Sequence, residues 1–146
     1  EAPTAPLIHL ACHGIFRSDN PMFSALRLGD SWLTAVEIAQ LQLHAALVVL
    51  SACESGRGQT PNGDEILGLT RAFLSAGAAT LVVSQWMVQD EAAALLMAAF
   101  YAHLAADQPV DAALRLAQLS VQTQYAHPYY WAPFVAMGKQ RSSVRN

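Results

Sequence analysis

The sequence is poor in cysteine and in basic residues. Its 146 residues include 2 cysteines, too few for a disulfide framework, although a Cys12–Cys53 bridge stays open as an alternative. We therefore expect free thiols and a reducing, cytoplasmic setting. Lys and Arg number 8 against 11 Asp and Glu, which gives a formal net charge of −3. A chain without a basic excess has little to gain from displacing counterions on a phosphate backbone, so nucleic-acid binding is not expected.

Long hydrophobic runs and two common catalytic motifs are also missing. The most apolar long segment, residues 92–106, is shorter than the ~20 residues that a membrane-spanning helix needs, so it predicts a core helix and no membrane association. The absence of a G-x-S-x-G motif removes the usual serine hydrolase interpretation. Segment 58–63 has the glycine spacing of a phosphate loop, but Asp64 and Glu65 follow where Lys and Ser or Thr belong. We interpret that segment as a flexible loop.

The residues that are present suit one α/β domain. A hydrophobic fraction of 53% over 146 residues is enough for a single core. Within a strand predicted over Ala46–Ser51, the continuous apolar run Leu47 to Leu50 is typical of a strand covered on both faces. Further strands are predicted at Leu7–Ala11, Ala79–Ser84 and Trp131–Met137. Helices between them imply right-handed parallel connections. The expected fold has three layers, with helices on both faces of a mostly parallel central sheet.

Local signals predict where turns and helices begin and end. Thr34 and Glu37 match a capping box that opens a short helix. The Gly29-Asp30 pair predicts the turn of a small hairpin. Gly77 has the place of a glycine that ends a helix, and Asp90 is expected to cap the helix that runs through Ala106.

Polar residues follow the first two predicted strands. His13 and Gly14 come after the first, and Ser51 and Cys53 come at the end of the second. Adjacent parallel strands end at the same edge of a sheet, so we expect His13 and Cys53 to lie close together. A cysteine thiolate is a nucleophile, and an imidazole can protonate the leaving amine. The backbone N–H groups of Gly14 and Cys53 can stabilise an oxyanion. The alternative is that both side chains are structural, because buried cysteines are commonly inert.

A metal site at the first strand is not expected. His9, Cys12 and His13 are metal-ligand types, but side chains alternate along a strand, so Cys12 should face away from both histidines. We expect Cys12 in the core, His44 in a loop and His103 on a helix surface. No cofactor is expected.

Several ordered motifs resemble one known family. LIHLACHG (residues 7–14) and LVVLSACESGRG (residues 47–58) look like the His-Gly and Ala-Cys motifs of caspase-like clan CD cysteine peptidases, including legumain-type enzymes. GDEILGLTRAFLSAGAATLVVSQWMVQDEA (residues 63–92) and HPYYWAPFVAMG (residues 127–138) follow in order. Together they closely resemble the CHAT domain, a caspase-like domain of proteins that also carry tetratricopeptide repeats. The resemblance covers nearly the whole chain.

The resemblance implies a function and its catalytic residues. It implies one caspase-like domain over residues 1–146, acting as a cysteine endopeptidase on protein or peptide substrates without metal or organic cofactor. The catalytic dyad would be Cys53 and His13, and the oxyanion hole would use the N–H groups of Gly14 and Cys53.

The resemblance also implies a substrate pocket that includes Ser51, Trp86, Met87 and Asp90. In the similar separases, a Trp-Asp-Val-Thr-Asp stretch shapes the pocket for a basic side chain. Here Met87 stands at the first acidic position, which argues against basic specificity, whereas Asp90 is kept. Metacaspases carry Asp where this chain has Ser51.

The family normally has further strand and helix elements before the His-Gly strand, whereas this chain begins almost at that strand, with Glu1. We therefore expect an N-terminally truncated domain from a longer polypeptide, whose repeat region, with an activating partner, regulates it. An open sheet edge would favour a homodimer. The alternative function is a catalytically silent signalling or protein-interaction module regulated by the attached repeat region. A nucleotide-binding flavodoxin-like domain also fits the α/β pattern but lacks a phosphate loop.

Overall fold

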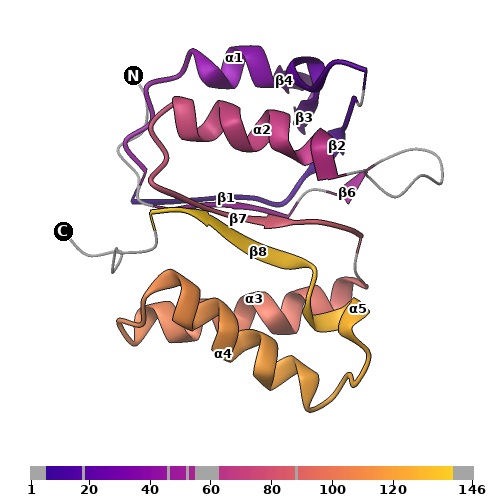
Figure 1. Cartoon of the computed structure of the whole chain (residues 1–146), viewed down its shortest axis with the longest axis vertical. Helices are drawn as coiled ribbons and strands as arrows, with labels where there is room; N and C mark the ends of the chain where they lie inside the picture. Colours follow the sequence, from indigo (N-terminus) through magenta and orange to yellow (C-terminus); the bar gives the residue numbers. More distant parts are fainter. Residues whose placement is uncertain are drawn as a thin grey trace.

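The described residues of the chain build three layers. The computed structural model describes residues 6–17, 19–45, 47–51, 53–54, 63–87 and 89–139, with Cys53, Glu54 and residues 63–65 described by their backbone. Helix α2 (Gly63–Ser75) covers one face of the main sheet, with α1 (Ala35–Ala39) packed against α2, and α3 (Asp90–Ala105) and α4 (Val110–Gln122) cover the other face (Figure 1). This arrangement confirms the predicted three-layer α/β fold.

The main sheet has four strands among the described residues. In spatial order they are β1 (Leu7–Leu10), β5 (Leu47–Leu50), β7 (Thr80–Ser84) and β8 (Phe134–Gly138). All four residues of β5 are buried, and they alternate between two cores: Val48 and Leu50 pack toward α2, and Leu47 and Val49 pack toward α3 and α4. Full burial of one such side chain stabilises the fold by about 1.5–3 kcal/mol. The predicted double coverage of this strand is confirmed.

The sheet is mostly parallel, as predicted, but strand β8 runs antiparallel to β7, with Ser84 opposite Phe134, so the helices between these two strands do not make the expected parallel connection. The long helices α3 and α4 and the short helix α5 (Pro128–Trp131) lie between the two strands (Figure 1). Helix α3 carries the chain away from the carboxyl end of β7, and α4 brings it back. The last strand therefore starts where β7 ends and must run in the opposite direction. The pairs β1–β5 and β5–β7 are parallel as predicted.

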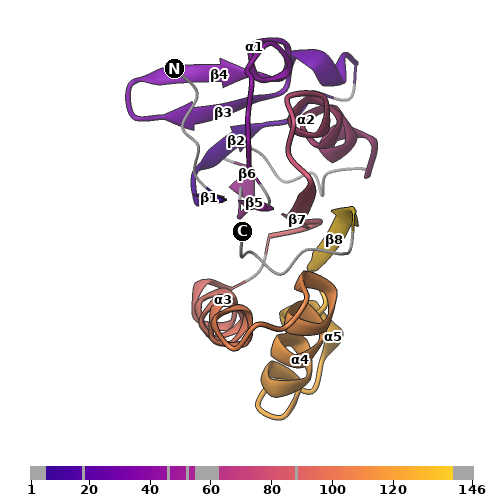
Figure 2. The same cartoon turned by 90° about the vertical axis from the view of Figure 1, so that its left-hand side faces the viewer.

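A second, smaller sheet lies beside α1 and α2 (Figure 2). Its order is β4 (Ser31–Thr34), β3 (Ala25–Leu28), β2 (His13–Ile15) and β6 (Cys53–Glu54). Strands β3 and β4 form the predicted hairpin around Gly29-Asp30. Strands β2 and β6 were not predicted, because runs of two or three residues are too short to show alternation. They continue the paths of β1 and β5 into a new sheet.

Most local signals act as predicted. The Thr34–Glu37 capping box is formed in both directions. Gly77 follows α2 with a φ of 109°, a left-handed value that ends the helix. Asp90, however, is not the cap of α3: Gln89 has that position without a side-chain hydrogen bond, and Asp90 lies in the first turn. An acidic residue there still suits the positive end of the helix dipole, and a cap and a first-turn residue differ by one position.

The apolar helix predicted over residues 92–106 corresponds to α3, which buries Ala92, Leu96, Met97 and Phe100 against the sheet and α4. No helix within the described part of the chain is long and apolar enough to span a membrane.

Candidate active site

The pairing of β2 with β6 brings the two predicted catalytic positions together. The two strands are parallel, and His13 is the register partner of Cys53 while Gly14 is the partner of Glu54. Neighbouring strands in a sheet lie about 4.8 Å apart, so the backbones of His13 and Cys53 are adjacent. The His13 side chain is exposed to solvent. A short parallel pair thus places the backbone of the exposed His13 next to the backbone of Cys53.

Gly14 lies where the backbone and a neighbouring ring approach each other closely. It is buried, and a Cβ atom at this position would lie 3.0 Å from two ring atoms of Phe16. A larger residue would therefore push the Phe16 ring away. Glycine keeps this ring close to the strand that carries His13.

The segment that leads to Cys53 is held by the first strand. The Ser51 N–H donates to the Leu10 carbonyl oxygen at 3.0 Å, which continues the β1–β5 ladder by one residue. Ser51 is half-buried. The two strands thus remain bonded until shortly before the second pair, β2 and β6, begins.

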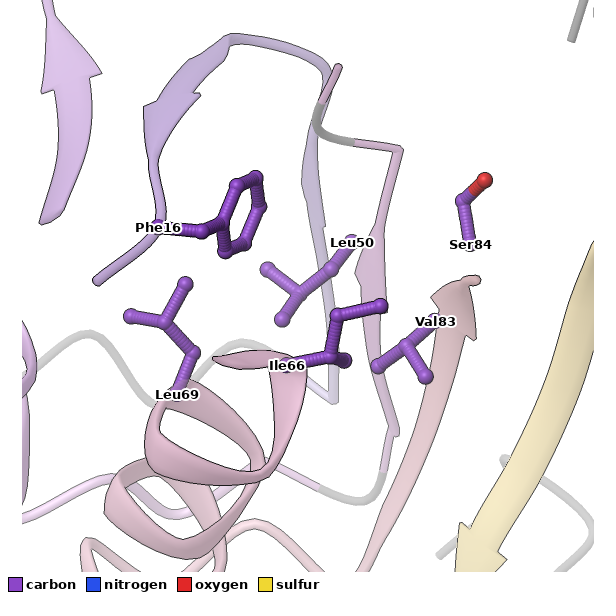
Figure 3. A pocket seen from close by; sticks show the side chains of 6 residues that line it. All are labelled: Phe16, Leu50, Ile66, Leu69, Val83 and Ser84. Carbon is purple, nitrogen blue, oxygen red and sulfur yellow. The ribbon is translucent and has the colours of Figure 1, made fainter. Parts of the chain in front are cut away.

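A small pocket opens at the carboxyl ends of β5 and β7 (Figure 3). It contains about 230 Å³ of empty space, including the part open to solvent. Its lining residues come from the segment directly after β2, from the two strand ends and from α2: Phe16, Leu50, Ile66, Leu69, Val83 and Ser84. Sequence reasoning did not identify this pocket. The available signal was that Leu50 and Ser84 are the last residues of two adjacent strands.

Ser84, the one polar residue of this lining, is already engaged. Its hydroxyl donates to the Trp86 carbonyl oxygen at 2.7 Å, within the turn that follows β7. In Figure 3 the Ser84 side chain lies at the rim, farther from α2 than the apolar side chains. The interior of the pocket is therefore apolar.

The remaining predicted pocket residues lie outside this lining. The Trp86 indole N–H donates to the Tyr129 carbonyl oxygen at 3.0 Å, which ties the turn after β7 to the short helix α5 (Pro128–Trp131). Met87 is 53% exposed, and Asp90 is exposed in the first turn of α3. The structure places all three residues after the carboxyl end of β7, on the same side as the pocket but not within it.

Cys12 is a structural thiol, as predicted. It is a free cysteine, and it packs against the core beneath α2. Burial raises its pKa, so its thiolate is less populated at neutral pH than that of an exposed cysteine.

His9, on β1, contacts Tyr101 on α3. Its Nδ1 atom is hydrogen-bonded to the Tyr101 hydroxyl at 2.8 Å, which links β1 to α3. Within the described residues, no group of three or more His, Cys, Asp or Glu side chains is placed to hold a metal ion. Desolvation lowers the pKa of His9 and raises the pKa of Tyr101 to about 12, so the pair is neutral near pH 7.

This pair predicts a pH-dependent stability. The unfolded chain protonates His9 near its ordinary pKa of about 6.5, whereas the folded chain resists protonation to a lower pH. The free energy of unfolding should therefore decrease as the pH falls below about 6.5. In urea titrations at pH 7.5 and 5.5, we expect the free energy of unfolding to fall less between the two pH values in His9→Gln than in the parent protein. The control His44→Gln, in an exposed loop, should lose as much as the parent, and an equal loss in all three proteins would contradict the prediction.

The chain was compared with known proteins. It matches the CHAT domain over residues 1–139. It is 38% identical over 113 residues to tetratricopeptide repeat protein 28 of Homo sapiens. These aligned residues make up 76% of this chain and 4% of that protein. The corresponding protein of Mus musculus is 37% identical over 113 residues, covering 76% of this chain and 5% of that protein. The chain thus spans about a twentieth of the length of the curated relatives it matches. Because the match extends over nearly all residues, the chain belongs to the CHAT domain family, a caspase-like, peptidase-related family.

Proposed function

We propose that this domain is a caspase-like cysteine endopeptidase in which Cys53 is the nucleophile and His13 its proton partner. The observation that carries the proposal is the register of β2 and β6, which places His13 beside Cys53. Thiol and imidazole are the pair that cysteine peptidases need, since the thiolate attacks and the imidazolium delivers a proton. The exposed position of His13 gives a peptide access to this pair.

The proposed reaction has two steps. The Cys53 thiolate forms a bond to the carbonyl carbon of the scissile peptide, and the oxyanion is stabilised by the N–H groups of Gly14 and Cys53. His13 donates its proton to the leaving amine as the C–N bond breaks, which leaves a thioester. Water then attacks the thioester and gives a proton to His13, and the acid product and the thiolate are released. Protein or peptide is the substrate, and no cofactor takes part.

The substrate pocket is proposed to lie after the carboxyl ends of β5 and β7. Ser51 precedes Cys53 by two residues, and the turn after β7 carries Trp86, Met87 and Asp90. The bond from Trp86 to Tyr129 supports this role, because it fixes the turn against α5. Met87 brings no charge to the site, so it gives no attraction for a basic substrate residue.

Regulation by a repeat region of the same polypeptide is also proposed. Two relatives carry the tetratricopeptide repeat in their names, and this chain matches only a small part of each. The same observation favours the second candidate function, a silent caspase-fold module that binds a partner under the control of such a region. The two functions differ in whether Cys53 reacts.

A covalent probe distinguishes them. A peptidyl acyloxymethyl ketone should label Cys53 in the parent protein, and His13→Ala should slow labelling at least about 10-fold, because the imidazole promotes thiolate formation. Mass spectrometry of the digested protein identifies the labelled cysteine. Cys12→Ala is the matched control and should label at the parent rate. Labelling that does not depend on His13, or that occurs mainly at Cys12, would contradict the proposal.

A further inference from the structure

We infer that the outer face of the second sheet binds an acidic segment of the peptide substrate, and that Arg27 and Trp32 determine this specificity. The outer face consists of the exposed residues His13, Ile15, Arg27 and Trp32. The inference rests on the proposed peptidase function, which brings the peptide to this sheet. It assigns a substrate class, a peptide with a carboxylate near the cleaved bond, and gives a role to two residues outside the predicted site.

The strand register places Arg27 and Trp32 in line with the proposed dyad. Cys53 is the register partner of His13, and Arg27 is the register partner of Trp32. Strands β2 and β3 are antiparallel, and their register, continued by one residue, sets His13 opposite Arg27. The positions Cys53, His13, Arg27 and Trp32 therefore form one row across the four strands of the second sheet (Figure 2).

Burial shows that this row has its side chains on the solvent side. Leu26 and Leu33 alternate with Arg27 and Trp32 along β3 and β4, and they pack into the core that includes α1 and α2. Residues directly opposite each other on neighbouring strands carry their side chains to the same face. Arg27 is exposed, Trp32 is 41% exposed, and the guanidinium carbon of Arg27 lies 6.0 Å from the centroid of the Trp32 ring. The two side chains thus share the outer face with the exposed His13.

Arg27 carries a positive charge that no carboxylate of the described residues neutralises. The one ion pair among these residues joins Arg17 to Asp19. The Arg27 Nε atom donates to the Gly29 carbonyl oxygen at 3.4 Å, and its two terminal nitrogens have no protein acceptor in the described part of the chain. Contact with the Trp32 ring holds the guanidinium group in place. The edge of the guanidinium group is free to bind both oxygens of a carboxylate.

The spacing and chemistry of the outer face suit an acidic segment of an extended peptide. Neighbouring strands lie about 4.8 Å apart, so Arg27 is about 10 Å from Cys53 along the row, and about three extended peptide residues span this distance. A glutamate about three positions from the cleaved bond can therefore reach Arg27, whereas a lysine there would meet a like charge. Ile15, which is 42% exposed, adds an apolar contact beside His13. Arg and Trp side chains are typical of the residues that contribute most to binding.

Peptide binding to the full Cys53→Ala protein tests the inference, because this protein does not consume the probe. The probes are fluorescein-labelled Ala-Glu-Leu-Ala-Glu-Leu-Ala and its versions with Gln or Lys in place of Glu, titrated by fluorescence polarisation. We expect the Glu peptide to bind at least about 10-fold more tightly than the Gln peptide, and the Lys peptide to bind most weakly. Arg27→Gln, made in the same protein, should bring the Glu and Gln peptides within about 2-fold of each other. The matched control Arg115→Gln, at an exposed position on α4, should keep the full difference.

Trp32→Ala tests the second residue of the inference. It should weaken binding of the Glu peptide about 5-fold or more, because the guanidinium group loses the ring that holds it and the peptide loses an apolar contact. The matched control Phe23→Ala removes a 55% exposed ring from the short helix Pro21–Phe23, which packs against α1 and α2, and should leave binding unchanged. Circular dichroism checks that all variants fold.

The outcomes separate this inference from the proposed function. A preference for the Glu peptide that is lost in Arg27→Gln supports the assignment, even where the parent protein cleaves nothing and the peptidase proposal fails. Equal affinity for the three peptides, a preference that survives Arg27→Gln, or no binding of any peptide up to about 1 mM overturns the assignment, even where the parent cleaves peptides. Unchanged binding in Trp32→Ala overturns the role of Trp32.

Discussion

Replacing Cys53 with alanine is expected to lower kcat/KM for peptide cleavage by at least about 10³-fold, because no other group in the proposed mechanism can form the acyl intermediate. Cys12→Ala is the matched control. It removes the other cysteine, whose burial raises the pKa of its thiol, and it should leave cleavage within about 3-fold of the parent. The measurement is initial rates on a peptide mixture, with circular dichroism to show that both variants fold.

The dyad proposal makes a sharper prediction for the double variant. His13→Ala alone should also cost at least about 10²-fold, since the thiolate loses its proton partner. If the two residues act as one unit, the double variant Cys53→Ala/His13→Ala should be no slower than Cys53→Ala alone, because the second change removes nothing that still functions. Full cleavage by Cys53→Ala would exclude Cys53 as the nucleophile, whereas no cleavage by the parent protein would favour the silent interaction module. Equal losses in Cys12→Ala would show that the loss reflects damage to the fold.

The layered fold was predictable because its signals are local and strong. The four apolar residues of β5 cannot alternate between core and solvent, so they require cover on both faces, and the structure supplies it. The Thr34–Glu37 capping box depends on residues three positions apart and forms as predicted. Such features need no knowledge of distant parts of the chain.

The direction of β8 and the second sheet were not predictable, because no local residue pattern indicates them. Hydrophobic alternation is the same in a parallel and an antiparallel strand, so the pattern of residues 134–138 carries no direction. The direction is set by the packing of α3 against α4, a tertiary feature. The predicted start of that strand at Trp131 was also early, because Pro128 in the first turn, with His127 as its cap, makes residues 128–131 a short helix.

In the candidate site, too, the features marked by local sequence were predictable and the features that depend on packing were not. The sequence indicated that His13 and Cys53 follow adjacent strands, and the adjacency of β1 and β5 is confirmed. That the dyad is catalytic stays a prediction. The apolar pocket was not predicted, because Phe16, Ile66 and Val83 come from three separate parts of the chain and meet only after α2 packs on the sheet. Side chains that carry chemistry leave a mark in the sequence, whereas the shape of the space beside them depends on packing.

The second large effect is on stability and concerns Gly77, the glycine that ends α2. After the helix, the Gly77 N–H donates to the Leu74 carbonyl oxygen at 3.2 Å and the Ala78 N–H to that of Phe73 at 3.0 Å, the two bonds of a Schellman motif. Gly77 has a φ of 109°, and a Cβ atom added to it would overlap the carbonyl oxygen of Leu43. This backbone contact is fixed, since the Leu43 N–H donates to the Ala76 carbonyl oxygen at 2.6 Å.

Gly77→Ala is therefore expected to lower the free energy of unfolding by about 4 kcal/mol, the sum of a strained backbone and an overlap with backbone atoms. Restriction of the unfolded chain by alanine offsets less than about 1 kcal/mol of this. Gly29→Ala is the matched control: its φ is 60° and a Cβ atom there meets nothing within 4 Å, so the cost should be about 1 kcal/mol. Urea unfolding followed by tryptophan fluorescence measures both. Equal losses in the two variants would show that the contact with Leu43 contributes nothing. A large loss at Gly77 alone would show that the end of α2 and the start of β7, which leads into the proposed substrate site, depend on this close approach.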